Sequence, residues 1–169
     1  LEGLWAGKEG FSEENLLSVA KTLKNRHWQY QKDAEISAIS VNDFSFYDLM
    51  LDNIVAFGAV PPRFANLSGR EQYFACARGN KTGVAMEMTK WFNTNYHYIV
   101  PELSSESKFS LKADKILNEY KEAKANGVKG KVNLIGPITF LALSKTTDGS
   151  CPFKHLDALV GEYKKLLEQ

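Results

Sequence analysis

The sequence has few of the residues that build disulfides and metal centres. It has two cysteines, Cys76 and Cys151, and neither belongs to a Cys-x-x-Cys pair, so we expect two free thiols, as in a reducing compartment. Its three histidines, His27, His97 and His155, are scattered along the chain. A zinc site needs three or four converging Cys, His or carboxylate ligands, so this spacing predicts no zinc site within these residues.

The chain also has little net charge and no long apolar run. Lysine and arginine total 21 against 20 acidic residues, a formal net charge of +1. This balance excludes a general electrostatic attraction to nucleic acid or to an anionic membrane, so any anion site must be local. No apolar segment approaches the roughly 20 residues of a membrane-spanning helix, and no basic-then-apolar leader begins the sequence. We therefore expect a cytoplasmic protein with no nucleic-acid or membrane partner.

Motifs for nucleophilic catalysis and for phosphate binding are missing as well. Cys76 lies in a helical pattern, where a small buried thiol is expected, and neither Ser45 nor Ser150 has an obvious base partner. The run Gly127-Val128-Lys129-Gly130-Lys131 superficially resembles a phosphate loop. It precedes a predicted strand instead of linking strand to helix, so we interpret it as a helix C-cap and a basic turn.

The apolar residues alternate between helical and strand periodicities. Helices are predicted from Ser12 into the thirties, from Asp43 to about Gly58, over 70–77, 112–126 and 138–144, and at the C-terminus up to Glu168. Strands are predicted over 36–41, 96–100 and 132–135. A polar loop is predicted over Gly79–Gly83. This order indicates an α/β fold with parallel βα units. Three strands are too few for a closed eight-stranded barrel, which needs roughly 250 residues.

Three aspartates follow the first predicted strand. Asp43 is placed to cap the next helix, and Asp48 and Asp52 lie four residues apart on one helix face. They can be interpreted as paired acids. The alternative is an N-cap with two surface carboxylates, the usual role of such aspartates.

The segment 88–101 is the most informative stretch of the chain. Residues 85–92 can form a helix, Asn93, Thr94 and Asn95 form a turn, and residues 96–100 read as a strand. A lysine, Lys90, beside a turn rich in amides can make an anion-binding corner. The alternative is a core hairpin with a solvated Lys90.

Beyond these patterns, a series of segments resembles one family in the same order. They are Arg26-His27-Trp28 with Gln31-Lys32, Asn42-Asp43-Phe44-Ser45-Phe46-Tyr47-Asp48, Gly58-Ala59-Val60-Pro61-Pro62-Arg63, Ala77-Arg78-Gly79-Asn80, the block 89–102, Glu119-Tyr120-Lys121-Glu122-Ala123-Lys124, and Gly136-Pro137-Ile138-Thr139-Phe140-Leu141. In these segments the chain is similar to the N-terminal domain of the cobalamin-independent methionine synthases. The resemblance runs from about Trp5 to Lys145 and weakens after Thr146.

The resemblance implies a fold and an activity. Residues 1–169 would be the first part of the family's N-terminal (β/α)8 TIM-type barrel, truncated at both ends. The whole enzyme would be a zinc-dependent methyltransferase that transfers a methyl group from 5-methyltetrahydrofolate polyglutamate to homocysteine. The resemblance places the zinc ligands and the homocysteine site in a C-terminal domain outside this chain. It therefore implies no catalytic residue and no metal ligand within residues 1–169, and its partners would be the folate and the remainder of the enzyme.

The resemblance also implies a role for two residues. Lys90 and Asn95 match a lysine and an asparagine that help the family bind the polyglutamate tail, Lys90 as counter-charge and Asn95 as hydrogen-bond partner. The family's basic Arg-Glu-Leu-Lys segment would lie before Leu1, so only part of that site is expected here. The alternative is a stand-alone, non-catalytic binding module derived from the same half-barrel. The flanking gene sequence discriminates between them, because a downstream His-x-Cys motif and later Cys would indicate the enzyme.

Overall fold

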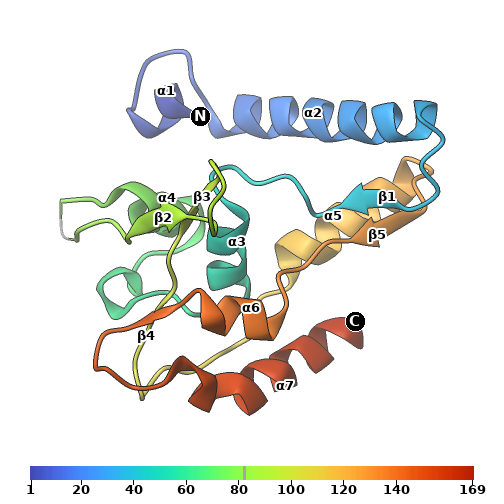
Figure 1. Ribbon diagram of the computed structural model, residues 1–169. Coiled ribbons are helices and arrows are strands. Elements are labelled where there is room, and N and C mark those ends of the chain that lie inside the picture. Colours follow the sequence, from blue (N-terminus) through green and yellow to red (C-terminus); the bar gives the residue numbers. More distant parts are fainter. Residues whose placement is uncertain (82) are drawn as a thin grey trace. The chain divides into compact units, whose positions relative to one another are not determined.

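The computed structural model describes residues 1–81 and 83–169, so position 82 of the polar loop predicted over Gly79–Gly83 lies outside the described residues. Its α-helices are α1 (Glu2–Trp5), α2 (Glu13–Asp33), α3 (Leu49–Ala56), α4 (Gly69–Arg78), α5 (Asp114–Ala125), α6 (Pro137–Ala142) and α7 (Leu156–Leu167), with 3-10 turns η1 (Pro62–Phe64) and η2 (Pro152–His155) (Figure 1). The strands are β1 (Ile39–Val41), β2 (Met88–Lys90), β3 (His97–Ile99), β4 (Glu102–Leu103), β5 (Gly130–Val132) and β6 (Lys145–Thr146).

The strands pair in twos. Within the described residues, β1 pairs with β5 and β4 with β6, both parallel, and β2 pairs with β3 antiparallel. Helices and parallel strand pairs confirm the α/β class. The partial barrel stays a prediction, because no sheet in this part of the chain has more than two strands.

One compact unit consists of residues 1–46 and 116–133. Helix α2 begins where the sequence predicts, with the Ser12 hydroxyl accepting from the Asn15 amide at 3.1 Å. Its Trp28 packs into a cluster with residues of β1 and α5, and the cluster consists of Trp28, Ile39, Val41, Ala123 and Val128. Strand β1 is shorter than predicted and starts at Ile39, because Ile36 is exposed and has no strand partner. Gly127 follows α5 with φ +67°, so the predicted C-cap is confirmed.

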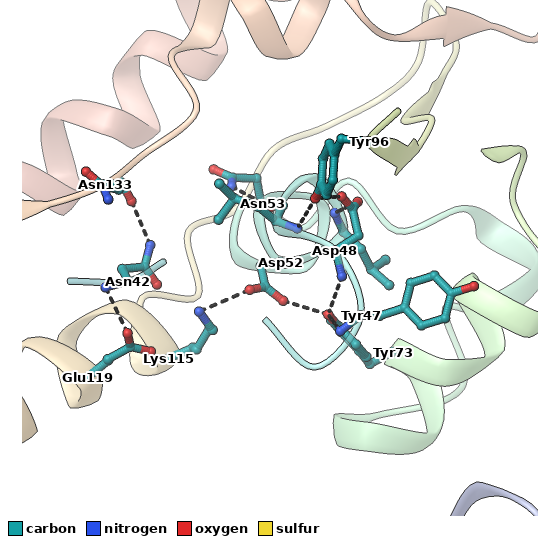
Figure 2. A network of polar contacts seen from close by, with 12 residues as sticks. Asn42, Tyr47, Asp48, Asp52, Asn53, Tyr73, Tyr96, Lys115, Glu119 and Asn133 are labelled. Carbon is teal, nitrogen blue, oxygen red and sulfur yellow. Dashed lines mark hydrogen bonds and ion pairs between the residues drawn. The ribbon is translucent and has the colours of Figure 1, made fainter. Parts of the chain in front are cut away.

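Asn42 holds the end of β1 in the same unit. Its backbone is left-handed, with φ +62°. Its amide N–H donates to Glu119 Oε1 at 2.8 Å, and its side chain donates to the Asn133 carbonyl at 2.8 Å (Figure 2). The strand predicted over 132–135 lies earlier in the chain, because β5 spans Gly130–Val132. Gly130 and Lys131, predicted to belong to a basic turn, are therefore strand residues, and Asn133 adds one further hydrogen bond to Val41.

The second unit consists of residues 47–115 and 134–169. Its core lies around α3, where Met50, Leu51 and Ile54 are fully buried, and the Phe57 ring stacks on Tyr163 of α7 at 4.2 Å. The helix predicted from Asp43 starts later, at Leu49. Asp48, not Asp43, is the N-cap, because its carboxylate accepts from the Leu51 amide while Asp43 is exposed and lies outside the helix.

The predicted helix over 85–92 is wrong. Residues 88–90 form β2, whose partners Ile99, Tyr98 and His97 lie on β3. The helical interpretation considered only local spacing, and cross-strand pairing with the aromatic and β-branched segment after the turn overrides that local preference. The predictions of α4, closed by Gly79 at φ +74°, and of the helices at α5, α6 and α7 are confirmed within a few residues.

In the described part of the chain, we find no helix with both the length and the apolar character needed to span a bilayer.

Candidate functional site

The β2–β3 hairpin carries both sequence-predicted site residues. Lys90 is the last residue of β2 and lies opposite His97. Beyond this pair, the Trp91 amide donates to the Tyr96 carbonyl at 2.7 Å, which leaves a four-residue loop over 92–95. Thr94 tightens the loop, since its hydroxyl donates to the Trp91 carbonyl at 2.7 Å. The hairpin therefore holds Lys90 and Asn95 near the same tip.

Both residues are open to solvent. Lys90 and Asn95 are exposed, and among the described residues Lys90 has no salt-bridge partner. The Asn95 carbonyl lies 3.0 Å from His97 Nδ1. A solvated Lys90 on a hairpin is what the plainer interpretation of this segment predicts. It is also what a ligand carboxylate requires, because the ammonium group keeps all three of its donors free for a ligand.

Aromatic side chains stiffen the hairpin. The Trp91 ring meets Tyr98 edge-on at 5.5 Å between centroids and Tyr96 at 6.4 Å. Tyr98 is buried, and its hydroxyl donates to the Leu143 carbonyl at 3.1 Å. Tyr96, His97 and Tyr98 thus act on the corner through packing and hydrogen bonds.

Asp48 joins the hairpin to the start of α3. Its Oδ1 accepts from the Tyr96 hydroxyl at 2.6 Å (Figure 2). Its Oδ2 accepts from the amides of Leu51 at 2.8 Å and Ile99 at 3.0 Å. Only 2% of Asp48 is exposed. The prediction of a surface carboxylate at this position is therefore wrong. The available signal was its place directly before the apolar run Leu49–Leu51, which is the usual position of an N-cap.

Asp52 is also buried, contrary to the surface prediction. It is 8% exposed, accepts from the Tyr73 hydroxyl at 2.8 Å and pairs with Lys115 at 3.0 Å. The Tyr73 oxygen in turn accepts from the amide of Tyr47 at 3.1 Å. Asp48 and Asp52 thus have different side-chain partners: Tyr96 donates to Asp48, and Tyr73 donates to Asp52. This geometry contradicts the interpretation of these residues as paired acids.

Burial and hydrogen bonding set the electrostatics beneath the hairpin. Burial raises the pKa of the Asp48 carboxyl, while the hydrogen bond from Tyr96 acts in the opposite direction. Burial, followed by the bond to Asp48, raises the pKa of Tyr96 to about 12. Asp48 accepts from two amides and a hydroxyl, all of which donate, so the ionised carboxylate is the form that fits this site. In this geometry the tyrosine hydroxyl donates to the aspartate.

The described residues do not fit a metal. Among them no three Cys, His, Asp or Glu side chains converge, so the zinc that the family resemblance implies finds no ligand set here. Cys76 is a free thiol, fully buried in α4, and burial raises its pKa to about 11. Cys151 is free and exposed. Both free thiols agree with the sequence prediction.

Sequence reasoning missed a cavity in the same unit. A cavity of about 380 Å³ is lined by residues 58–63, 102–104, 106–108 and 147. Arg63 lies on its wall, donates to both carboxylate oxygens of Glu102 and gives its Nε–H to the Val84 carbonyl at 2.9 Å. The hydrogen bond that Arg63 donates to Glu102 raises the pKa of the guanidinium. Through three of its five N–H donors, Arg63 holds neighbouring segments together.

Comparison with known proteins identifies the family. The family model "Cobalamin-independent synthase, N-terminal domain" matches residues 1–169. Three similar relatives each bear the name 5-methyltetrahydropteroyltriglutamate–homocysteine methyltransferase. The protein from Desulforamulus reducens is 61% identical over 151 residues, which cover 89% of this chain and 20% of the relative. Those from Mycolicibacterium paratuberculosis and Mycobacterium bovis are 48% and 47% identical over 168 residues, covering 98% of this chain and 22% of each relative.

The chain thus spans about a fifth of the length of the curated relatives it matches. The family model nevertheless covers the chain from residue 1 to residue 169, and the sequence identity to these relatives is 47–61%. The chain belongs to the cobalamin-independent synthase family and carries sequence of its N-terminal domain.

Proposed function

We propose that this chain is part of a methyltransferase that moves a methyl group from 5-methyltetrahydrofolate polyglutamate to homocysteine in the cytoplasm, making methionine. Within that enzyme, residues 1–169 supply scaffold, as the first part of a (β/α)8 barrel, and part of the site for the polyglutamate tail. The observation that carries the proposal is the match of the whole chain to the family, whose relatives bear this activity in their names.

The hairpin chemistry supports the tail site. A polyglutamate tail presents a series of carboxylates and peptide carbonyls. An exposed Lys90 ammonium can pair with a carboxylate, and the Asn95 amide can donate to a carbonyl or carboxylate. Zinc would be held by residues outside this chain, where it would bind homocysteine sulfur and lower its thiol pKa. The residues described here bind and orient the folate tail and contribute no proton transfer.

Lys90→Ala tests the tail site in a protein of the relatives' full length that carries this chain. We expect KM for the triglutamate folate to rise about tenfold, because a partly exposed charge-assisted contact contributes about 1–2 kcal/mol. The loss should be much smaller for the monoglutamate, whose tail is short, and should shrink as salt rises. Affinity for homocysteine and zinc should stay unchanged.

Lys131→Ala is the matched control, since Lys131 is also an exposed lysine within a two-stranded sheet but lies on β5. It should leave both folate substrates unaffected. Equal losses on mono- and triglutamate folates in Lys90→Ala would mean that Lys90 supports the fold or the pterin end, and the tail-binding role would have to be given up.

A further inference from the structure

We propose that Asp48 and Tyr96 form a positioning pair: their contact fixes the β2–β3 hairpin on α3 and so sets where Lys90 and Asn95 meet the glutamate tail. This inference rests on the proposed tail site and adds residues that do not touch the ligand. It starts from the size of the hairpin, which has three paired residues in each strand. An isolated two-stranded hairpin is marginally stable at best in water, so its geometry depends on what holds it.

Asp48 holds β3 at both of its ends. The Tyr96 hydroxyl, just before the strand, donates to Oδ1, and the Ile99 amide, the strand's last residue, donates to Oδ2. The same carboxylate caps α3 through the Leu51 amide. One buried side chain therefore ties Tyr96 and Ile99, which flank and end β3, to a helix whose inner face is fully buried.

Tyr96 carries this restraint to the tip. It follows Asn95 directly in sequence, and its carbonyl accepts from the amide of Trp91, which follows Lys90. Each tail-site residue is thus one peptide unit from the Tyr96–Trp91 pair. A shift of Tyr96 therefore displaces both Lys90 and Asn95. Asp48 itself is 2% exposed and bonded on both oxygens, so it has no surface with which to contact a ligand.

Tyr96→Phe in the full-length enzyme removes the hydroxyl and keeps the ring that packs on Trp91. We expect KM for the triglutamate folate to rise about fivefold, since a displacement of about 1 Å in a positioned group is enough to weaken its contact strongly. The value of kcat and KM for the monoglutamate folate should stay within about twofold of the parent. A purely structural role would instead lower activity on both substrates alike.

Tyr163→Phe is the matched control, because it removes a buried hydroxyl that donates to the Ile135 carbonyl, from α7 and not from the hairpin. It should reduce thermal stability without changing the preference for triglutamate over monoglutamate. An equal rise in triglutamate KM in Tyr163→Phe and Tyr96→Phe would overturn the inference, since the effect would then follow general stability.

The double variant Lys90→Ala/Tyr96→Phe separates this inference from the proposed function. If Tyr96 acts through Lys90 and its neighbours, the second change adds less than its own single effect, because residues in one unit are not additive. Two outcomes refute the positioning pair and leave the tail site standing. In one, the effects of the two changes on triglutamate KM are fully additive. In the other, Tyr96→Phe leaves the triglutamate KM unchanged while Lys90→Ala shows its expected loss. No dependence on glutamate number in Lys90→Ala refutes the tail site itself.

Discussion

Replacing Asp48 by alanine should destabilise the protein much more than the loss of an ordinary helix cap. The cap itself contributes about 1 kcal/mol. The Ile99 amide, which is fully buried, would be left without its acceptor at a cost of about 1–3 kcal/mol. The Tyr96 hydroxyl lies on a half-exposed side chain, so water can replace most of that bond at a cost under about 1 kcal/mol. The expected loss in free energy of unfolding is therefore about 2–5 kcal/mol.

Asp48→Asn is the matched comparison. Asparagine caps helices as well as aspartate, but it keeps one acceptor oxygen in place of two. One oxygen can serve the Leu51 and Ile99 amides while the side-chain amide turns to the Tyr96 oxygen. We expect this variant to lose about 1–2 kcal/mol.

Urea denaturation measures both variants, with far-ultraviolet circular dichroism for the helices and fluorescence for the environments of Trp5, Trp28 and Trp91. A loss below about 1 kcal/mol for Asp48→Ala would show that the carboxylate does not hold the hairpin. Equal losses in the two variants would show that the one acceptor oxygen kept by Asp48→Asn does not hold the Leu51 and Ile99 amides, and the bonding scheme proposed for Asp48 would be wrong.

Two further predictions concern the 169-residue chain by itself. Thiol labelling at pH 8 should modify Cys151 rapidly and Cys76 only after unfolding. Cys76 is buried and its pKa is raised to about 11, so little reactive thiolate forms. Fast labelling of a folded Cys151→Ser variant would contradict this prediction. The chain should also show no methyltransferase activity and no stoichiometric zinc after metal reconstitution, since its described residues offer no converging ligand set. Elemental analysis decides the second point: one tightly held zinc per chain, lost on replacing His97 or Cys76, would refute it.

The sequence alone determined the features that depend on neighbouring residues. Ser12 before Glu13 and Glu14 predicts the start of α2, because a hydroxyl cap and first-turn acids act within one turn. Gly79 predicts the end of α4 for a similarly local reason, since its left-handed backbone favours glycine. The ordered segments also carried the family resemblance, which the comparisons bear out.

Tertiary structure decided which of two locally acceptable arrangements forms. Residues 88–90 can be written as helix or strand, and pairing with β3 selects the strand. Asp43 and Asp48 are both able to cap a helix, and Asp48 is chosen because its carboxylate also reaches the Ile99 amide, 51 residues along the chain. That contact turned a predicted surface acid into the buried support of the hairpin. Sequence spacing cannot show it, because the bond joins two segments that only the folded chain brings together.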